Sequence, residues 1–148
     1  ICLMHMQGDP QTMQLAPSYS SVVEEVIAFL AERVVACVEA GISRGRLLVD
    51  PGFGFGKRLA DNLDLVAHLS ELAALELPIL VGMSRKGMLG QMTGRDVDGR
   101  LAGGTAAASI AVLNGALIVR THDVSATVDA VKVGHAVRMA SQTMVRPS

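Results

Sequence analysis

The sequence predicts an α/β fold in which parallel strands alternate with helices, arranged as about four βα units that form the C-terminal half of a (β/α)8 barrel. Four short runs, residues 1–4, 47–49, 78–81 and 117–119, are apolar without alternation, as in strands buried on both faces. A polar or glycine-rich turn follows each run and leads into a segment with helical periodicity. A small doubly wound sheet has the same rhythm. The strand-like first residue and the polar residues clustered after each strand favour the barrel half.

Two helices are predicted in the first half of the chain. The first covers residues 21–40, where Ser21 and Glu24 match a capping box and Gly41 supplies the stop. Its apolar stripe consists of Val22, Val26, Ile27, Leu30, Val34 and Val38. The second opens near Asp61 or Asn62 and ends before Pro78, and the side chains expected to face the sheet are Leu63, Val66, Leu69 and Leu72.

Two further helices follow the third and fourth strands. One covers residues 100–114, and its alanine-rich composition predicts close packing against its neighbours. The last begins near Ser125, with Val128, Val131 and Val137 toward the core and with charges outside at Asp129, Lys132 and Arg138. Since no linker or low-complexity stretch interrupts the pattern, residues 1–148 are expected to form a single domain.

Composition excludes several classes of function. Thirteen basic residues balance 14 acidic ones, and only 3% of residues are aromatic, so a general nucleic-acid binder is not expected. Residues 101–119 carry no charge, but their glycines and polar residues favour a buried helix that runs into a strand over a membrane span. Cys2 and Cys37 are predicted to be buried thiols, and no targeting segment is evident, so we expect a cytoplasmic protein.

The strongest chemical signal is the segment DPGFGFGK at residues 50–57, directly after the second strand. It places Asp50 at the mouth of a strand, where its carboxylate could accept paired N–H donors from the edge of a heterocycle; a turn aspartate before proline is the structural alternative. The glycine spacing does not match a dinucleotide fingerprint. Phe53 or Phe55 could belong to the core, but two of the chain's three phenylalanines in one glycine loop favour the wall of a ligand site.

Cationic residues follow the third and fourth strands. Lys86 lies in GMSRKG, where its ammonium could extend into a pocket or remain in solvent. Arg120 and His122 point to the same side of the fourth strand, beside the start of a helix, and this pairing favours an anion site. The structural alternative is a satisfied histidine followed by a helix-capping Asp123.

Metal binding by this chain is not predicted. His5 lies between Met4 and Met6, but no second histidine or cysteine lies nearby, so the methionines are expected to line an apolar pocket. His68 and His135 fall in helical segments and are interpreted as surface or helix-packing residues.

Taken together, LMHMQGDPQTMQ, LLVDPGFGFGK, LVGMSRKGMLG and LIVRTHDV resemble the C-terminal half of the dihydropteroate synthases over essentially the whole chain. The resemblance implies strands five to eight of a pterin-binding barrel whose N-terminal half is absent here. It implies condensation of (7,8-dihydropterin-6-yl)methyl diphosphate with 4-aminobenzoate, which gives 7,8-dihydropteroate and diphosphate in folate synthesis. A Mg²⁺ cofactor would be bound by an Asn in the absent half. The resemblance also implies a homodimer and membership in a family that sulfonamides target.

The resemblance assigns a role to each matching residue. Asp50 would bind the amino and N–H edge of the pterin, and Lys86 would contact the pterin and line the aminobenzoate site. Arg120, Thr121 and His122 would bind the diphosphate, and Lys86, Arg120 and His122 would be catalytic. The remaining pocket residues would be Met4, Phe55, Gly82 and Ser84. Many family members have Ser where this chain has Gly87, near the aminobenzoate carboxylate, so that contact is expected to come from backbone N–H groups of the following helix.

Two other functions remain open at this point. A methyltetrahydrofolate-binding barrel of corrinoid methyl transfer shares the pterin pocket but needs no diphosphate site, so the pair Arg120 and His122 argues against it. A non-catalytic half-barrel that binds pterin or phosphate is the second. Because four parallel strands leave open edges and a bare inner wall, we expect the isolated chain to associate with itself and to lack synthase activity.

Overall fold

The computed structural model describes residues 1–143; the predicted domain also includes residues 144–148, which lie outside the described residues. The elements are β1 (Cys2–Met4), α1 (Val22–Glu39), η1 (Arg44–Arg46), β2 (Leu48–Asp50), α2 (Leu59–Ala67), η2 (Leu69–Leu75), β3 (Leu80–Val81), α3 (Gly87–Thr93), α4 (Leu101–Leu113), β4 (Ile118–Val119) and α5 (Val124–Thr143). All four expected strands are present within two residues of their expected bounds.

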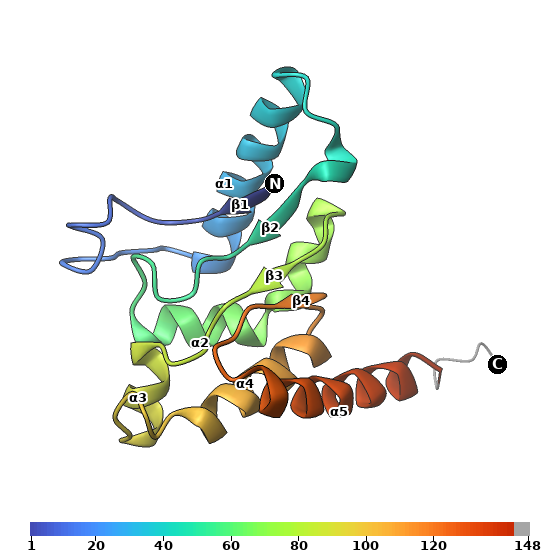
Figure 1. Cartoon of the computed structure of the whole chain (residues 1–148). Helices are drawn as coiled ribbons and strands as arrows, with labels where there is room; N and C mark the ends of the chain where they lie inside the picture. Colours follow the sequence, from blue (N-terminus) through green and yellow to red (C-terminus); the bar gives the residue numbers. More distant parts are fainter. Residues whose placement is uncertain (144–148) are drawn as a thin grey trace.

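The four strands run parallel and lie side by side in chain order (Figure 1). Strand β1 pairs with β2, with Met4 opposite Asp50, and β3 pairs with β4, with Val81 opposite Val119. A single parallel bridge between Val49 and Ile79 joins the two pairs. The carboxyl ends of all four strands therefore lie at one edge of the sheet, as the sequence predicts.

Helix α1 covers β1 and β2 with Val22, Val26, Leu30 and Val34, all of which are buried. Two details of the prediction are wrong. Val38 is exposed, because Val34 is the last fully buried residue of the helix and Cys37 supplies the contact with the core in the next turn. The predicted capping box does not form, because the carboxylate of Glu25 accepts the backbone N–H groups of Ser20 and Ser21 at 2.8 and 3.2 Å.

Helix α2 begins at Leu59, before the predicted position, and its first turn is closed by Asp61, which accepts the backbone N–H of Arg58 at 2.8 Å. The chain then continues as the 3₁₀ helix η2. The buried side chains are Leu65, Leu69, Leu72 and Leu75, while Leu63 is exposed, contrary to the prediction. Leu69 and Leu72 are buried as predicted. Leu63 lies in α2, whose buried residues are Asp61, Asn62 and Leu65, and its side chain therefore falls on the solvent side.

Helix α4 matches its prediction, with Arg100 and Asn114 as its caps, whereas the short helix α3 was not predicted. Helix α5 packs against α4 at Gly134, where an added Cβ would lie 2.6 Å from the Ser109 carbonyl oxygen. Val128 and Val137 are therefore exposed rather than buried, because the small residues Thr127 and Gly134 form the close contact.

The apolar core lies between the sheet and the helices that cover it, and it includes Leu89 of α3 and Ala111 of α4 as well as residues of α1, α2 and η2. Phe53 is among its fully buried members. Cys2 is exposed and Cys37 is half-buried, so the prediction of two buried thiols is wrong; β1 is an edge strand that leaves Cys2 uncovered. No helix within residues 1–143 is both long and apolar enough to cross a membrane, and the uncharged segment 101–119 divides into α4 and β4.

Candidate active site at the ends of the strands

Asp50 ends β2 and is only 3% exposed. Its Oδ1 accepts the backbone N–H of Gly52 at 2.8 Å. Burial raises the pKa of Asp50, and the Gly52 hydrogen bond and the charges of Lys86, Arg120 and Lys57 oppose the rise. Position 52 requires glycine, because its φ is +70° and a Cβ there would lie 1.9 Å from the His5 carbonyl oxygen. The turn after Asp50 is thus pressed against the chain that leaves β1.

Lys86 precedes α3 and reaches back across the loop that follows β2. Its Nζ lies 4.1 Å from the centre of the Phe55 ring and donates a hydrogen bond to the Phe53 carbonyl oxygen. Burial lowers the pKa of Lys86 to about 8; Asp50 opposes this shift and Arg120 adds to it. This contact joins the loop after β3, which carries Lys86, to the loop after β2, which carries both phenylalanines. Phe55 is a wall of the site, whereas Phe53 is fully buried and belongs to the core.

Arg120 follows β4, and its guanidinium lies directly over the backbone of Gly82. An added Cβ at Gly82 would be 3.0 Å from the Arg120 Nε, so a side chain there would displace the guanidinium. Two residues further on, His122 contacts Ser84, with Nδ1 2.9 Å from Oγ and the His122 backbone N–H donating to the same Oγ at 3.2 Å. These contacts join the loops after β3 and β4.

A cavity of about 280 Å³ lies between these loops, and its lining consists of Gly82, Ser84, Lys86, Arg120, Thr121 and His122. All six belong to the set predicted from the sequence. The ammonium, the guanidinium and the imidazole lie on this one lining, so the cavity suits an anion with several oxygen atoms.

The other three predicted residues lie beside this cavity. Asp50 is close enough for the charges of Lys86 and Arg120 to affect its pKa, but it takes part in none of the four ion pairs within 4 Å among residues 1–143. Met4 is opposite Asp50 in the sheet, and Phe55 lies under Lys86. The structure therefore brings all nine predicted site residues to one end of the strands.

Two polar residues that the sequence did not single out as site residues are buried beneath the loop after β2. Lys57 is 4% exposed, and its Nζ lies 2.8 Å from Nδ1 of His5, which is 5% exposed. Burial lowers the pKa of Lys57 to about 7 and that of His5 to about 4. The one feature of the sequence that could have indicated a role for Lys57 is its position at the end of the glycine-rich loop.

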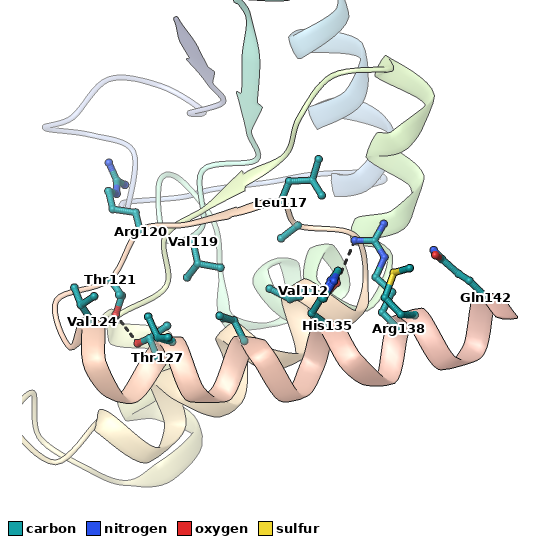
Figure 2. Close-up of a pocket in the computed structure, with 14 residues that line it drawn as sticks. Val112, Leu117, Val119, Arg120, Thr121, Val124, Thr127, His135, Arg138 and Gln142 are labelled. Carbon is teal, nitrogen blue, oxygen red and sulfur yellow. Dashed lines mark hydrogen bonds between the residues drawn. The ribbon is translucent and has the colours of Figure 1, made fainter.

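A larger groove of about 730 Å³ runs between β4 and α5 (Figure 2). Its lining is mostly apolar and includes Leu117, Val119, Val124, Val128 and Val131. Arg120 and Thr121 lie at one end of the groove, and the Arg120 guanidinium points away from α5. This groove lies along the edge of β4, the last strand of the described sheet.

The donor set of the described residues does not fit a metal site. Within residues 1–143, no group of three or more His, Cys, Asp or Glu side chains is placed to hold a metal ion. Exposed His68 is paired with Asp64, at 2.9 Å from Nδ1 to Oδ1, and His135 is an exposed residue of α5, in agreement with their interpretation as surface residues.

Comparison with known proteins places this geometry in a family. The family model described as "Pterin binding enzyme" matches residues 1–122. The dihydropteroate synthase of Escherichia coli strain K12 is 49% identical over 142 residues, which are 96% of this chain and 50% of that protein.

Two solved structures are similar in both sequence and fold. The Yersinia pestis dihydropteroate synthase with a sulfonamide drug superimposes with a TM-score of 0.91 at 50% identity, covering 94% of this chain and 51% of that one. The Xanthomonas albilineans dihydropteroate synthase in complex with 7,8-dihydropteroate gives 0.84 at 48% identity, with 99% and 51% covered. The chain spans about half the length of the relatives it matches. It belongs to the pterin-binding enzyme family, and these relatives are dihydropteroate synthases.

Proposed function

We propose that the chain supplies one half of a dihydropteroate synthase, with the diphosphate site and part of the pterin site. The reaction condenses (7,8-dihydropterin-6-yl)methyl diphosphate with 4-aminobenzoate to give 7,8-dihydropteroate and diphosphate. The convergence of Lys86, Arg120 and His122 on one cavity, with Asp50 beside it, carries the proposal. The family match supports it, because the relatives have this activity in their names.

Asp50 binds the pterin in this proposal. A carboxylate that is buried and bonded on one side by the Gly52 N–H retains free acceptor positions for the amino group and ring N–H of the heterocycle. Burial raises its pKa, while the nearby charges of Lys86 and Arg120 favour the ionised form that accepts both hydrogen bonds. Met4 and the Phe55 ring provide apolar walls near this carboxylate.

The cationic cavity binds the diphosphate. During the reaction the aromatic amine nitrogen of 4-aminobenzoate forms a bond to the methylene carbon of the pterin, while the bond from that carbon to the diphosphate oxygen breaks. The bonding electron pair leaves with the diphosphate, and the amine loses a proton. Negative charge therefore grows on the leaving oxygen, and the preorganised Arg120 and His122 stabilise it. Lys86 lies between this cavity and Phe55 and contributes a third positive charge.

The second substrate is placed near Ser84, Gly82 and Phe55, next to Lys86. Backbone N–H groups at the start of α3, which begins at Gly87, would bind the carboxylate of this substrate. The magnesium ion expected for the family finds no fitting set of ligands among residues 1–143, so no step is assigned to it here.

The groove along β4 suggests where the other half of the barrel packs. Leu117 is 66% exposed and Val124 is 60% exposed, and both line this groove at the open edge of the sheet. The relatives are about twice as long as this chain, so their remaining strands would cover such an edge. We therefore propose that the active unit contains a complementary half of this kind and that, as in the family, this unit is a homodimer.

Reconstitution tests the proposed function. Residues 1–148 are produced together with the N-terminal half of the E. coli relative, purified as one complex, and assayed for 7,8-dihydropteroate and diphosphate. We expect turnover by the complex and none by either half alone. A complex that binds the pterin substrate but forms no dihydropteroate would support the non-catalytic alternative instead, and one that binds neither substrate nor diphosphate would refute the proposal.

A further inference from the structure

The loop between β2 and α2 carries Asp50 and Phe55, and the side chain of Lys57 closes it from the inside. The Lys57 Nζ lies 2.8 Å from Nδ1 of His5, 3.0 Å from the Gly52 carbonyl oxygen and 3.2 Å from the Phe55 carbonyl oxygen. An ammonium has three N–H donors, so these three acceptors match its capacity. Within residues 1–143, Lys57 forms no ion pair within 4 Å.

The two carbonyl groups belong to the residues that place the site. Gly52 donates its backbone N–H to the Asp50 carboxylate, and the ring of Phe55 lies under the Lys86 ammonium. Lys57 and His5 are themselves absent from the lining of the 280 Å³ cavity. Lys57 can therefore act on a bound ligand only indirectly, through the loop and through its charge on Asp50. The His5→Leu variant, which keeps the lysine, separates these two routes.

His5 is held firmly on the other side of this contact. Its ring meets the Phe29 ring edge-on at 5.0 Å between centres, and its backbone N–H donates to the Asp50 carbonyl oxygen at 3.0 Å. Burial, followed by the charge of Lys57, lowers the pKa of His5 to about 4. The imidazole is therefore neutral at pH 7, and its Nδ1 accepts the hydrogen bond whenever Lys57 is protonated.

An ammonium group in this buried position has an unfavourable desolvation free energy. Transfer of a charge from water into a protein interior is unfavourable, and apolar residues of similar volume often stabilise a fold equally well. The hydrogen bonds from Lys57 to the Gly52 and Phe55 carbonyl oxygens, at two turns of the same loop, offset this desolvation. Such a bonded charge fixes the conformation of the loop, which an apolar side chain with no directional contacts would not do.

We infer that Lys57 and His5 are a positioning pair that holds the Asp50 carboxylate and the Phe55 ring in the orientation that binds the pterin. The inference rests on the proposed function, because it assigns the pterin to Asp50. It predicts a larger effect on one substrate. The pterin site takes both Asp50 and Phe55 from the loop after β2, whereas the 4-aminobenzoate site takes only Phe55 from this loop and its other residues from the loop after β3.

The test compares Lys57→Met with the matched control Lys132→Met, since Lys132 is an exposed lysine of α5. In the reconstituted complex, Lys57→Met should raise the KM for the pterin diphosphate by roughly 10-fold or more, because small misplacements of a binding group are costly. The KM for 4-aminobenzoate should rise less, by about threefold at most, because Phe55 is the one residue of this loop placed near that substrate. The control should alter neither value.

A second pair of variants separates positioning from general damage. His5→Asn retains an acceptor near the place of Nδ1 and should preserve pterin binding, whereas His5→Leu removes the acceptor and should match Lys57→Met. Equal increases in both KM values, or an unchanged pterin KM in Lys57→Met and His5→Leu, would overturn the inference.

Amide hydrogen exchange of the 148-residue chain gives a readout that does not need catalysis. The Phe55 N–H donates to the Gly52 carbonyl oxygen and the Gly54 N–H donates to Asn62. Lys57→Met should accelerate exchange at both amides while exchange in α1 stays unchanged. Unchanged exchange at both amides would overturn the inference, and an inactive complex with accelerated exchange would count against the proposed function alone.

Discussion

Ser84 and His122 stand three residues beyond a register pair of the sheet, and their side chains continue that register into the loops. Val81 is opposite Val119, and the His122 Nδ1 lies 2.9 Å from the Ser84 Oγ. The next positions are joined as well, because Nε and Nη2 of Arg85 donate hydrogen bonds to the Asp123 carboxylate, at 3.3 and 2.9 Å.

These contacts between the two loops require a strained backbone at Arg85, whose φ of 61° is in the left-handed region. The Arg85 carbonyl oxygen accepts a hydrogen bond from Arg100 at 2.9 Å, so contacts on both sides hold this backbone. The consequence is that Ser84 and Lys86, on either side of Arg85, both reach the cavity.

Removal of a cavity cation should reduce catalysis strongly. In the reconstituted complex, Arg120→Ala or Lys86→Ala should lower kcat/KM by roughly 100-fold or more, because each charge stabilises the departing diphosphate or the bound pterin. Steady-state kinetics with the pterin diphosphate measures the effect. Lys132→Ala, at an exposed position of α5 outside both the cavity and the groove, is the control. A loss of less than about threefold in the cavity variants would contradict their assignment.

Gly87→Ser should improve use of 4-aminobenzoate. A Cβ at position 87 meets no atom within 4 Å, so the serine fits at the start of α3. Its hydroxyl would add a hydrogen bond to the substrate carboxylate, which corresponds to a KM lower by roughly 2- to 10-fold. Gly87→Ala is the control for the helix itself, and an identical KM in the two variants would show that the carboxylate lies elsewhere.

Gly52→Ala should lower the free energy of unfolding of the chain far more than Gly41→Ala does. Both glycines have positive φ, +70° and +85°, but a Cβ at Gly41 meets nothing within 4 Å while one at Gly52 collides with the His5 carbonyl oxygen. Urea titration should show a loss of about 1–2 kcal/mol at Gly41 from backbone strain. The loss at Gly52 should exceed roughly 3 kcal/mol. Similar losses in the two variants would mean that the loop after β2 can move away from the His5 carbonyl oxygen without a loss of stability.

The stability of the chain should fall as the pH drops from about 6.5 to about 4, because of His5. Its pKa is 6.5 in the unfolded chain and about 4 in the folded one, so the unfolded state binds an extra proton throughout this interval. The maximal slope for one proton is about 1.4 kcal/mol per pH unit. Denaturant titrations at several pH values should show this slope, and His5→Asn should remove it; parallel curves would contradict the shift.

The isolated chain should associate with itself through the groove along β4. Leu117→Lys introduces charge at an exposed apolar position of that groove, so it should shift sedimentation velocity profiles toward the monomer. Leu15 is 80% exposed and lies outside the groove, and Leu15→Lys is therefore the matched control. Equal effects of the two variants would place the contact on another surface.

The order of strands and the location of the site were predictable because both depend on local pattern. Uninterrupted apolar runs mark strands buried on both faces, and parallel strands bring their carboxyl ends together, so Asp50, Lys86 and Arg120 had to share one edge. Helical faces were less predictable. The exposure of Leu63 on α2 and the close contact of α5 with α4 at Gly134 are both set by packing, and neither follows from the apolar pattern of the sequence.

What the sequence determined by itself is therefore the parallel α/β order and the set of charged groups at the ends of the strands. Only the tertiary structure determined that Lys57 and His5 are buried against each other, 52 positions apart. Charged residues usually remain in water, and a buried one is stable only where distant segments supply acceptors in the right geometry. A contact between residues so far apart in the sequence produces no periodic pattern from which it could be predicted.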